Sequence, residues 1–408
     1  MPAPNRVECS HSALQVEVSP AAAEAGFTRP SLGARKAAAT PQGRANAAVQ
    51  QHEIDDFTFP APLVLPDDIL YLDPNDEEPQ SLLSWIREKY RNPITARRKT
   101  IYVAAVPIIT DEVSFMNAWT VPANMSPGKS KGKAQTEATP IPSPTIPDTI
   151  AYLTAFYHPL PVKQLPLPTS FLNLNDILDA AMAVLPKDAH SLVMMFDHDA
   201  YEDEDDDFCC GRAYGGSRVA MVSSARYHPA LDEGVDYAHM WPGSHWGRKR
   251  KQRGDGEDGG SGDVVVAGGG EETPLGAAVR AASKSGPPLT QDLYGLWFSR
   301  VARTISHELG HCFCLAHCSQ PPYLCPVCLA KVVRAIKDVE RGGGEDEIAA
   351  RRYAALAEFC KGWEQVAMFA GYRAWLEKRM EILGQQGLEA GGGVFDGEEG
   401  TREKPIEL

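Results

Sequence analysis

A five-residue segment, HELGH at positions 307–311, combines the residue types of a zinc-dependent hydrolytic site. Positions i and i+4 of a helix share one face about one turn apart, so the imidazoles of His307 and His311 can reach one metal ion. Glu308 is placed to reach a water on the metal rather than the metal itself. In such a site the metal lowers the pKa of the water and polarises a carbonyl, while the carboxylate moves the proton.

A third ligand is needed, and His317 lies six residues beyond His311. On a continuing helix it would lie ~240° around from His311 and face away from the metal. The helix must therefore end and turn back, as it does at a glycine in the metzincin pattern H-E-x-x-H-x-x-G-x-x-H. Cys314 occupies that glycine position, where a left-handed turn costs a non-glycine residue ~1 kcal/mol or more. We expect the turn nonetheless, with strain at Cys314.

The alternative is a chance match on an ordinary core helix. His317 at the metzincin spacing, and the apolar helical pattern of residues 293–309 that leads into the motif, favour a metal site.

A cysteine cluster follows the third histidine. Cys318 is adjacent to His317, and Cys325 and Cys328 form a C-x-x-C pair that can place two thiolates on one ion. Together these supply three sulfurs, whereas a closed structural zinc site usually has four ligands. Three further cysteines are candidates for the fourth: Cys312, Cys314 and Cys360. For Cys360 we favour a buried position on a helix instead.

Composition narrows the class of protein. The 408-residue chain has a formal net charge of −14, which disfavours nucleic acid and anionic membranes as partners. It shows neither a secretion signal at its start nor the ~18 consecutive apolar residues of a membrane span. We therefore expect a cytoplasmic or nuclear protein whose nine cysteines are not disulfide-bonded.

The pattern along the chain predicts one large catalytic domain. We expect a disordered region at 1–62, a domain at 63–383 with low-complexity insertions near 120–148 and 247–289, and a disordered tail at 384–408. Within the domain, apolar runs predict strands at 100–109, 191–196 and 218–224, and a strand or extended piece at 162–167. Helical spacing predicts helices at 81–90, 149–157, 176–185, 293–309, 329–339 and 348–382. This order indicates an α/β (α+β) fold, with the active-site helix against a mixed sheet and helices at the C-terminus.

At these residues the chain resembles the archaemetzincins, a family of zinc metallopeptidases. The family motif, H-E-x-x-H-x-x-G-x-x-H-C followed by C-x-M, a spacer and C-x-x-C, is similar to HELGHCFCLAHC and YLCPVCLAKV here. Weaker similarity extends to ILYLDP, TIYVAAVPII, AYLTAFYHPLPVKQLP and FCCGRAYGGSRVAMVSSARYHP. The resemblance covers most of residues 63–380.

The resemblance implies a metzincin-like fold and two zinc ions. The catalytic zinc would be held by His307, His311 and His317, with Glu308 as general base. The structural zinc would be held by four cysteines, of which three match: Cys318, Cys325 and Cys328.

Two departures from the family pattern bear on activity. Cys314 replaces the glycine, and only six residues, SQPPYL, separate Cys318 from Cys325. The C-x-M element is therefore absent, and with it the methionine that forms a hydrophobic floor beneath the catalytic zinc. Six residues span at most ~20 Å, too little for a detour below the site. We expect the histidine-bound zinc to be less well supported in this shortened form.

The resulting hypothesis is a zinc metallopeptidase that acts on a peptide or protein substrate and is a monomer. The alternative is a catalytically impaired zinc-binding protein that serves as a structural or interaction module. Glu308 favours the enzyme, because a pure binding module needs no carboxylate beside its ligands. A thiol-redox sensor using Cys312 and Cys314 is a third possibility.

Overall fold

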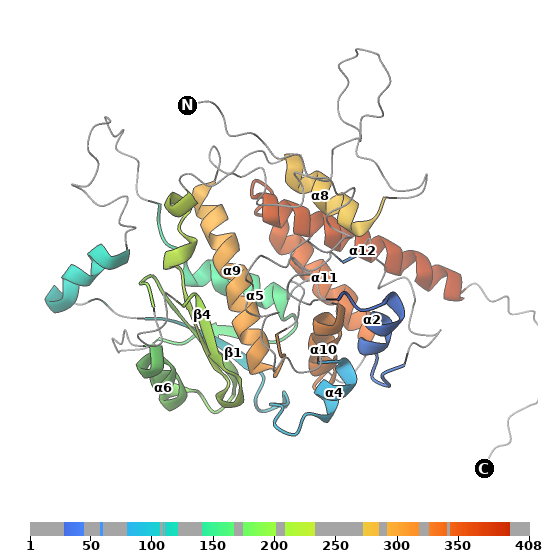
Figure 1. The fold of residues 1–408 in the computed structure, drawn as a ribbon, viewed down its shortest axis with the longest axis horizontal. Helices are drawn as coiled ribbons and strands as arrows, with labels where there is room; N and C mark the ends of the chain where they lie inside the picture. Colours follow the sequence, from blue (N-terminus) through green and yellow to red (C-terminus); the bar gives the residue numbers. More distant parts are fainter. Residues whose placement is uncertain are drawn as a thin grey trace, which may run out of the picture.

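The computed structural model describes residues 28–44, 58–59, 80–106, 109, 111–120, 141–166, 174–200, 209–232, 272–284, 292–317, 326–340 and 343–391. They form a five-stranded mixed sheet flanked by helices, with a further group of helices on one side (Figure 1). The predicted combination of a mixed sheet, a helix carrying the motif and C-terminal helices is thus confirmed. Among the described residues, no helix has both the length and the apolar character needed to cross a bilayer.

The sheet is parallel except at one edge. Its order is β2 (Val162–Gln164), β1 (Thr100–Ala105), β3 (Ala189–Phe196), β5 (Val219–Ser223) and β4 (Gly211–Tyr214). All eight residues of β3 are buried, as expected for a parallel strand covered on both faces. β4 pairs antiparallel with β5 and was not predicted, because its four half-buried residues form no apolar run.

Alternate residues of the strands serve two separate cores. Leu192 and Met194 pack with Ile177 and Leu178 of α6 (Leu174–Val184) on one face. Val193 belongs to the larger cluster on the opposite face. Side chains alternate along a strand, so the sheet separates α6 from the helix that carries the motif.

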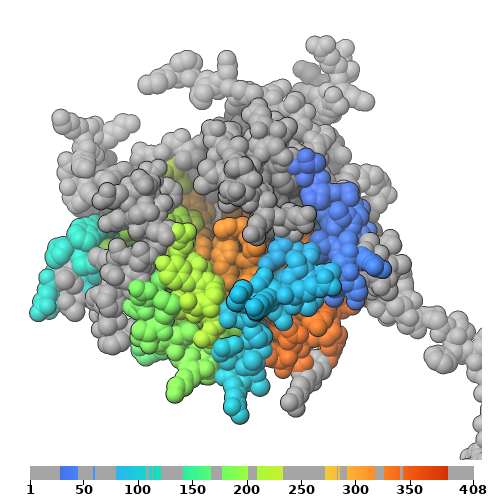
Figure 2. All heavy atoms as spheres, turned by 60° about the horizontal axis from the view of Figure 1, so that its bottom comes forward, coloured from blue at the N-terminus to red at the C-terminus, as the bar shows by residue number. Residues whose placement is uncertain are grey.

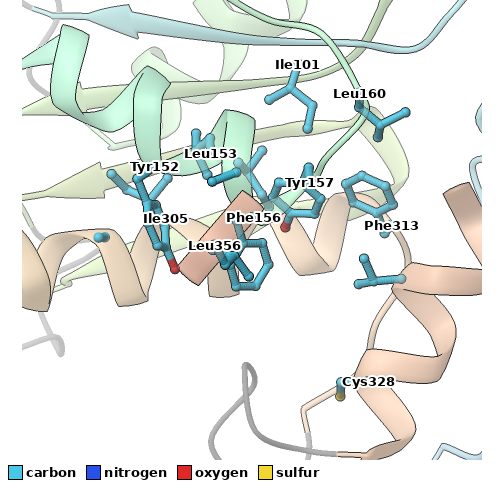
Figure 3. Packing of buried hydrophobic residues seen from close by; sticks show 14 of the residues in the cluster. Ile101, Tyr152, Leu153, Phe156, Tyr157, Leu160, Ile305, Phe313, Cys328 and Leu356 are labelled. Carbon is cyan, nitrogen blue, oxygen red and sulfur yellow. The ribbon is translucent and has the colours of Figure 1, made fainter. Parts of the chain in front are cut away.

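Two helices of the larger core pack against the sheet: α5 (Ile146–Phe156) and α9 (Leu293–Cys312). Figure 3 shows the aromatic side chains Tyr152, Phe156 and Tyr157 gathered near Ile305 of α9. The hydroxyl of Tyr152 donates to Ser306 Oγ at 3.2 Å, and that of Tyr157 donates to the Ser306 carbonyl at 3.1 Å. The segment of α9 just before the motif is therefore fixed by both apolar and polar contacts.

The C-terminal helices are α10 (Pro326–Lys337), α11 (Glu345–Lys361) and α12 (Ala367–Gly391). The region predicted as one helix at 348–382 is divided between α11 and α12, since α11 ends at Gly362.

Two helices, and the last part of α12 at 384–391, occupy regions where the sequence predicted no order. α8 (Pro274–Lys284) falls in the predicted insertion 247–289 and packs on α12. A Cβ at Gly371 of α12 would lie 3.0 Å from the Ala278 carbonyl oxygen, so glycine allows the close approach. α2 (Leu32–Ala38) falls within 1–62 and is capped by Ser31. The structure does not describe residues 1–27, 45–57 and 60–62 of the first region, most of the two insertions (121–140, 247–271 and 285–289), or 392–408 of the predicted tail.

Candidate metal centre

Three histidine side chains converge at the C-terminal end of α9. One ring nitrogen from each of His307, His311 and His317 lies within 4.8 Å of the others. His307 and His311 are half-buried on one face of the helix, whereas His317 is exposed and lies beyond the helix end. The structure thus brings together all three residues that sequence spacing selects as metal ligands.

The spacing of the nitrogens fits a metal ion. His307 Nε2 and His311 Nε2 are 3.2 Å apart. Two nitrogens at tetrahedral positions around zinc, each ~2.0–2.1 Å from the ion, are separated by about 3.3 Å. The group can therefore hold a metal ion, and its first two donors already have the separation that zinc requires.

A backbone carbonyl sets the tautomer of His311. Its Nδ1 lies 2.7 Å from the Leu315 oxygen, which can only accept a hydrogen bond. The proton is therefore on Nδ1, and the lone pair of Nε2 is directed to the other histidines. Metal-binding histidines commonly have this second hydrogen bond, which fixes the ring orientation.

The turn after α9 has the expected left-handed residue. Cys314 has a φ of +61°, which confirms the prediction of a strained turn at the glycine position. The Leu315 N–H donates to the Gly310 carbonyl at 3.1 Å, and the Cys314 N–H to the His311 carbonyl at 2.8 Å. This pair of hydrogen bonds is a Schellman motif, which ends the helix and reverses the chain toward His317.

Glu308 is buried against the edge strand of the sheet. Its side chain is 7% exposed, and a Cβ at Gly211 of β4 would lie 2.7 Å from its Oε1. Burial raises the pKa of Glu308 from 4.5 to about 7, against an opposing effect of Arg212. A carboxyl group with a pKa near neutrality can both accept and release a proton at physiological pH.

A second glycine allows the chain to approach the end of α9 closely. Gly215 begins the short 3-10 turn η2 (Gly215–Ser217), and a Cβ there would lie 2.4 Å from the His311 carbonyl oxygen. The Gly215 carbonyl in turn accepts from Asn92 Nδ2 at 2.8 Å. β4 and η2 therefore contact α9 along the motif, from Glu308 to His311.

A narrow cavity of about 30 Å³ lies beside His307 and His311. Its lining is mostly apolar and includes His307, His311, Leu315, Cys328 and Val332. The volume is enough for about one or two water molecules. α10 thus supplies apolar side chains beside the histidine site.

The cysteines are only partly described. Cys318 and Cys325 lie outside the described residues, so the second zinc site remains a prediction. Cys328 is 3% exposed, belongs to the main core and lines the cavity beside the histidines. Cys360 is fully buried on α11, in agreement with its expected core position.

The two cysteines of the redox hypothesis lie in unfavourable surroundings for a reactive thiolate. Burial raises the pKa of Cys312, which is fully buried, and also that of Cys314, which is half-buried. Reactive cysteines usually have a lowered pKa and are accessible. The structure therefore weighs against thiol-redox chemistry at this pair.

Sequence reasoning missed Gln80, which contacts the turn, and Lys331, which contacts Gln80. Gln80 hydrogen-bonds to the turn from 234 positions away in the chain, and no local pattern signals such a contact.

No family model matches the chain, and neither does any curated protein or solved structure.

Proposed function

We propose that this chain is a zinc-dependent peptidase with the metzincin-like fold of the archaemetzincins, in which His307, His311 and His317 hold a catalytic zinc. The observation that carries the proposal is the convergence of three imidazoles on a helix end that also bears the buried carboxylate of Glu308. Structural zinc sites are usually closed by four protein ligands, whereas three leave a position for water and substrate.

The chain's own residues support a hydrolytic mechanism. Bound zinc would lower the pKa of a water molecule and polarise the substrate carbonyl. Glu308 accepts a proton from the attacking water as the water oxygen bonds to the carbonyl carbon. The carboxyl group then delivers this proton to the amine nitrogen as the carbon–nitrogen bond breaks. In the metal-free site, burial raises the pKa of Glu308, which favours uptake of the proton.

The edge strand supports a peptide as the substrate. β4 lies at one end of the strand order, and the described residues place no strand on its outer side. An exposed strand edge can pair with an extended peptide through main-chain hydrogen bonds. Since Gly211 of β4 contacts Glu308, a peptide paired there would pass close to the base.

The proposal includes a second, structural zinc held by Cys318, Cys325 and Cys328. Its role would be to fix the short segment that connects the third histidine to α10. A closed thiolate site contributes directly to folding stability.

The test is the Glu308→Gln variant. It should keep its fold and its zinc but lose peptide hydrolysis by ~10²-fold or more, the scale of a lost general base. Turnover of a fluorogenic peptide library and zinc content by elemental analysis are measured together. The control is Glu358→Gln, which removes an exposed carboxylate on α11 and should leave both unchanged.

The possible outcomes separate the hypotheses. Undiminished turnover in Glu308→Gln would exclude Glu308 as the base. Loss of zinc from this variant would instead identify Glu308 as a metal ligand. A wild-type protein that binds zinc in the histidine site but hydrolyses no peptide would favour the alternative, a zinc-binding structural or interaction module.

A further inference from the structure

A side-chain amide from a distant segment completes the turn that leads to His317. Gln80 Nε2 donates to the Cys314 carbonyl at 3.2 Å, and Gln80 Oε1 accepts from the Ala316 N–H at 3.1 Å. The two backbone groups flank Leu315, so one amide binds both sides of the turn. Ala316 immediately precedes His317, and this contact therefore fixes the backbone at the point where the third histidine leaves it.

A buried lysine fixes the orientation of this amide. Lys331 of α10 is 1% exposed, and its Nζ donates to Gln80 Oε1 at 2.6 Å and to the Gln80 carbonyl at 2.9 Å. An ammonium group can only donate, so the side-chain atom that it contacts must be the oxygen of the amide. The NH₂ group is then left facing the Cys314 carbonyl. A charge-assisted hydrogen bond of this length is also stronger than a neutral one.

The residues after Gln80 continue across the end of α9. Trp85 Nε1, in α4 (Leu82–Arg87), donates to the Phe313 carbonyl at 2.9 Å. Asn92 reaches η2 on the other side. In Figure 2 this part of the chain, in cyan, lies between the yellow-green residues of the sheet edge and the orange helices. The segment 80–92 thus forms a strap over the end of the active-site helix.

We propose that Gln80 and Lys331 are positioning residues that hold His317 in place for the metal, an inference that rests on the proposed zinc site. His317 is exposed and follows a turn with strain at Cys314. Helix geometry fixes His307 and His311 but not His317. The hydrogen bonds from Gln80 supply the missing constraint, and Lys331 locks Gln80 in the orientation that makes them.

The first experiment measures zinc affinity by competition with a chromophoric chelator. Gln80→Ala and Lys331→Met should each bind zinc ~10–100-fold more weakly, the usual effect of removing groups that orient metal ligands. The matched control is Gln365→Ala, whose amide donates to the Asp292 carboxylate at 2.9 Å beside the opposite end of α9. It should leave zinc affinity unchanged.

The second experiment separates positioning from general stability. In the His317→Ala background, adding Gln80→Ala should weaken the remaining zinc affinity no further, because the residue it positions is gone. Cobalt substituted for zinc should also show an altered visible spectrum in Gln80→Ala. If Gln80→Ala fails to fold, Gln80→Glu keeps the acceptor for Ala316 and Lys331, loses the donor to Cys314, and should still weaken affinity.

Folded Gln80 variants with wild-type zinc affinity would overturn this inference but leave the proposed function standing. An equal loss of affinity with and without His317 would also overturn it, since the effect would then not pass through that residue. A wild-type protein that binds no zinc would instead overturn the proposed function.

Discussion

The two parts of the histidine site are held by different means. His307 and His311 lie on a 20-residue helix whose inner face is packed against the sheet and α5. His317 lies outside that helix and is exposed, after a turn hydrogen-bonded by Gln80. The first part is built from local periodicity and apolar burial. The second depends on a few polar contacts between segments far apart in the sequence, and it should therefore be easier to disturb.

Phe313 joins the two parts, and its removal should have the largest effect on stability. The ring is 1% exposed and stacks on Tyr157 with centroids 5.0 Å apart, while its carbonyl accepts from Trp85. Phe313→Ala should lower the free energy of unfolding by ~3–5 kcal/mol, as for other large core deletions. It should also weaken zinc binding in the molecules that remain folded. Denaturant titration and chelator competition measure the two effects.

Phe369→Ala is the matched control for this variant. Phe369 is also fully buried but lies on α12, and its ring packs on Phe298, which is on α9 but far from its histidine-bearing end. We expect a similar loss of stability with unchanged zinc affinity. If both variants weakened zinc binding equally, the distinction between the junction and the rest of the core would be wrong.

His190 offers a second way to sharpen the comparison, through pH. Its ring is buried beside Phe313, and this burial lowers its pKa from 6.5 to about 4. Between these values the unfolded chain binds more protons than the folded one, so stability falls as the pH is lowered. The contribution of neutral His190 is complete above pH 6.5 and is lost toward pH 4. Its size is about 3 kcal/mol.

The measurement is the free energy of unfolding of the metal-free protein between pH 7 and pH 4. His190→Gln should reduce the pH dependence in this window, because glutamine does not titrate there. An unchanged slope in the variant would show that other groups cause the acid sensitivity.

Cys314→Gly should have the smallest effect, and it should be stabilising. Cys314 has a φ of +61°, a conformation that costs a non-glycine residue ~1–2 kcal/mol. Glycine removes this cost but gains ~0.4–1 kcal/mol of entropy in the unfolded chain. The net gain should be about 0.5–1 kcal/mol in denaturant titration. Cys314→Ala removes the thiol but keeps the strain. An equal gain in the free energy of unfolding in that variant would show that the effect comes from losing the thiol rather than from relieving the strain.

The sequence predicted what local patterns determine. The apolar run of β3, the helical spacing of α9 and the left-handed turn at Cys314 all follow from neighbouring residues. β4 was missed because GRAY has neither length nor alternation, although its glycine is what lets the strand approach Glu308.

The support of the third histidine was missed for a different reason. Gln80 and Lys331 have no metal-binding character of their own, and they meet only because the fold brings residues 251 positions apart together. Polar contacts of this kind have no period along the chain. They can be recognised only once the tertiary structure is known.

The most direct test of the histidine site is the zinc content per chain, measured by elemental analysis of the purified wild-type protein and its His311→Ala variant. His311 is chosen because its Nε2 already lies 3.2 Å from that of His307. The variant should contain one equivalent of zinc less than the wild type, with any zinc in the cysteine site retained. Equal zinc content in the two proteins would contradict the assignment of these histidines as the metal site.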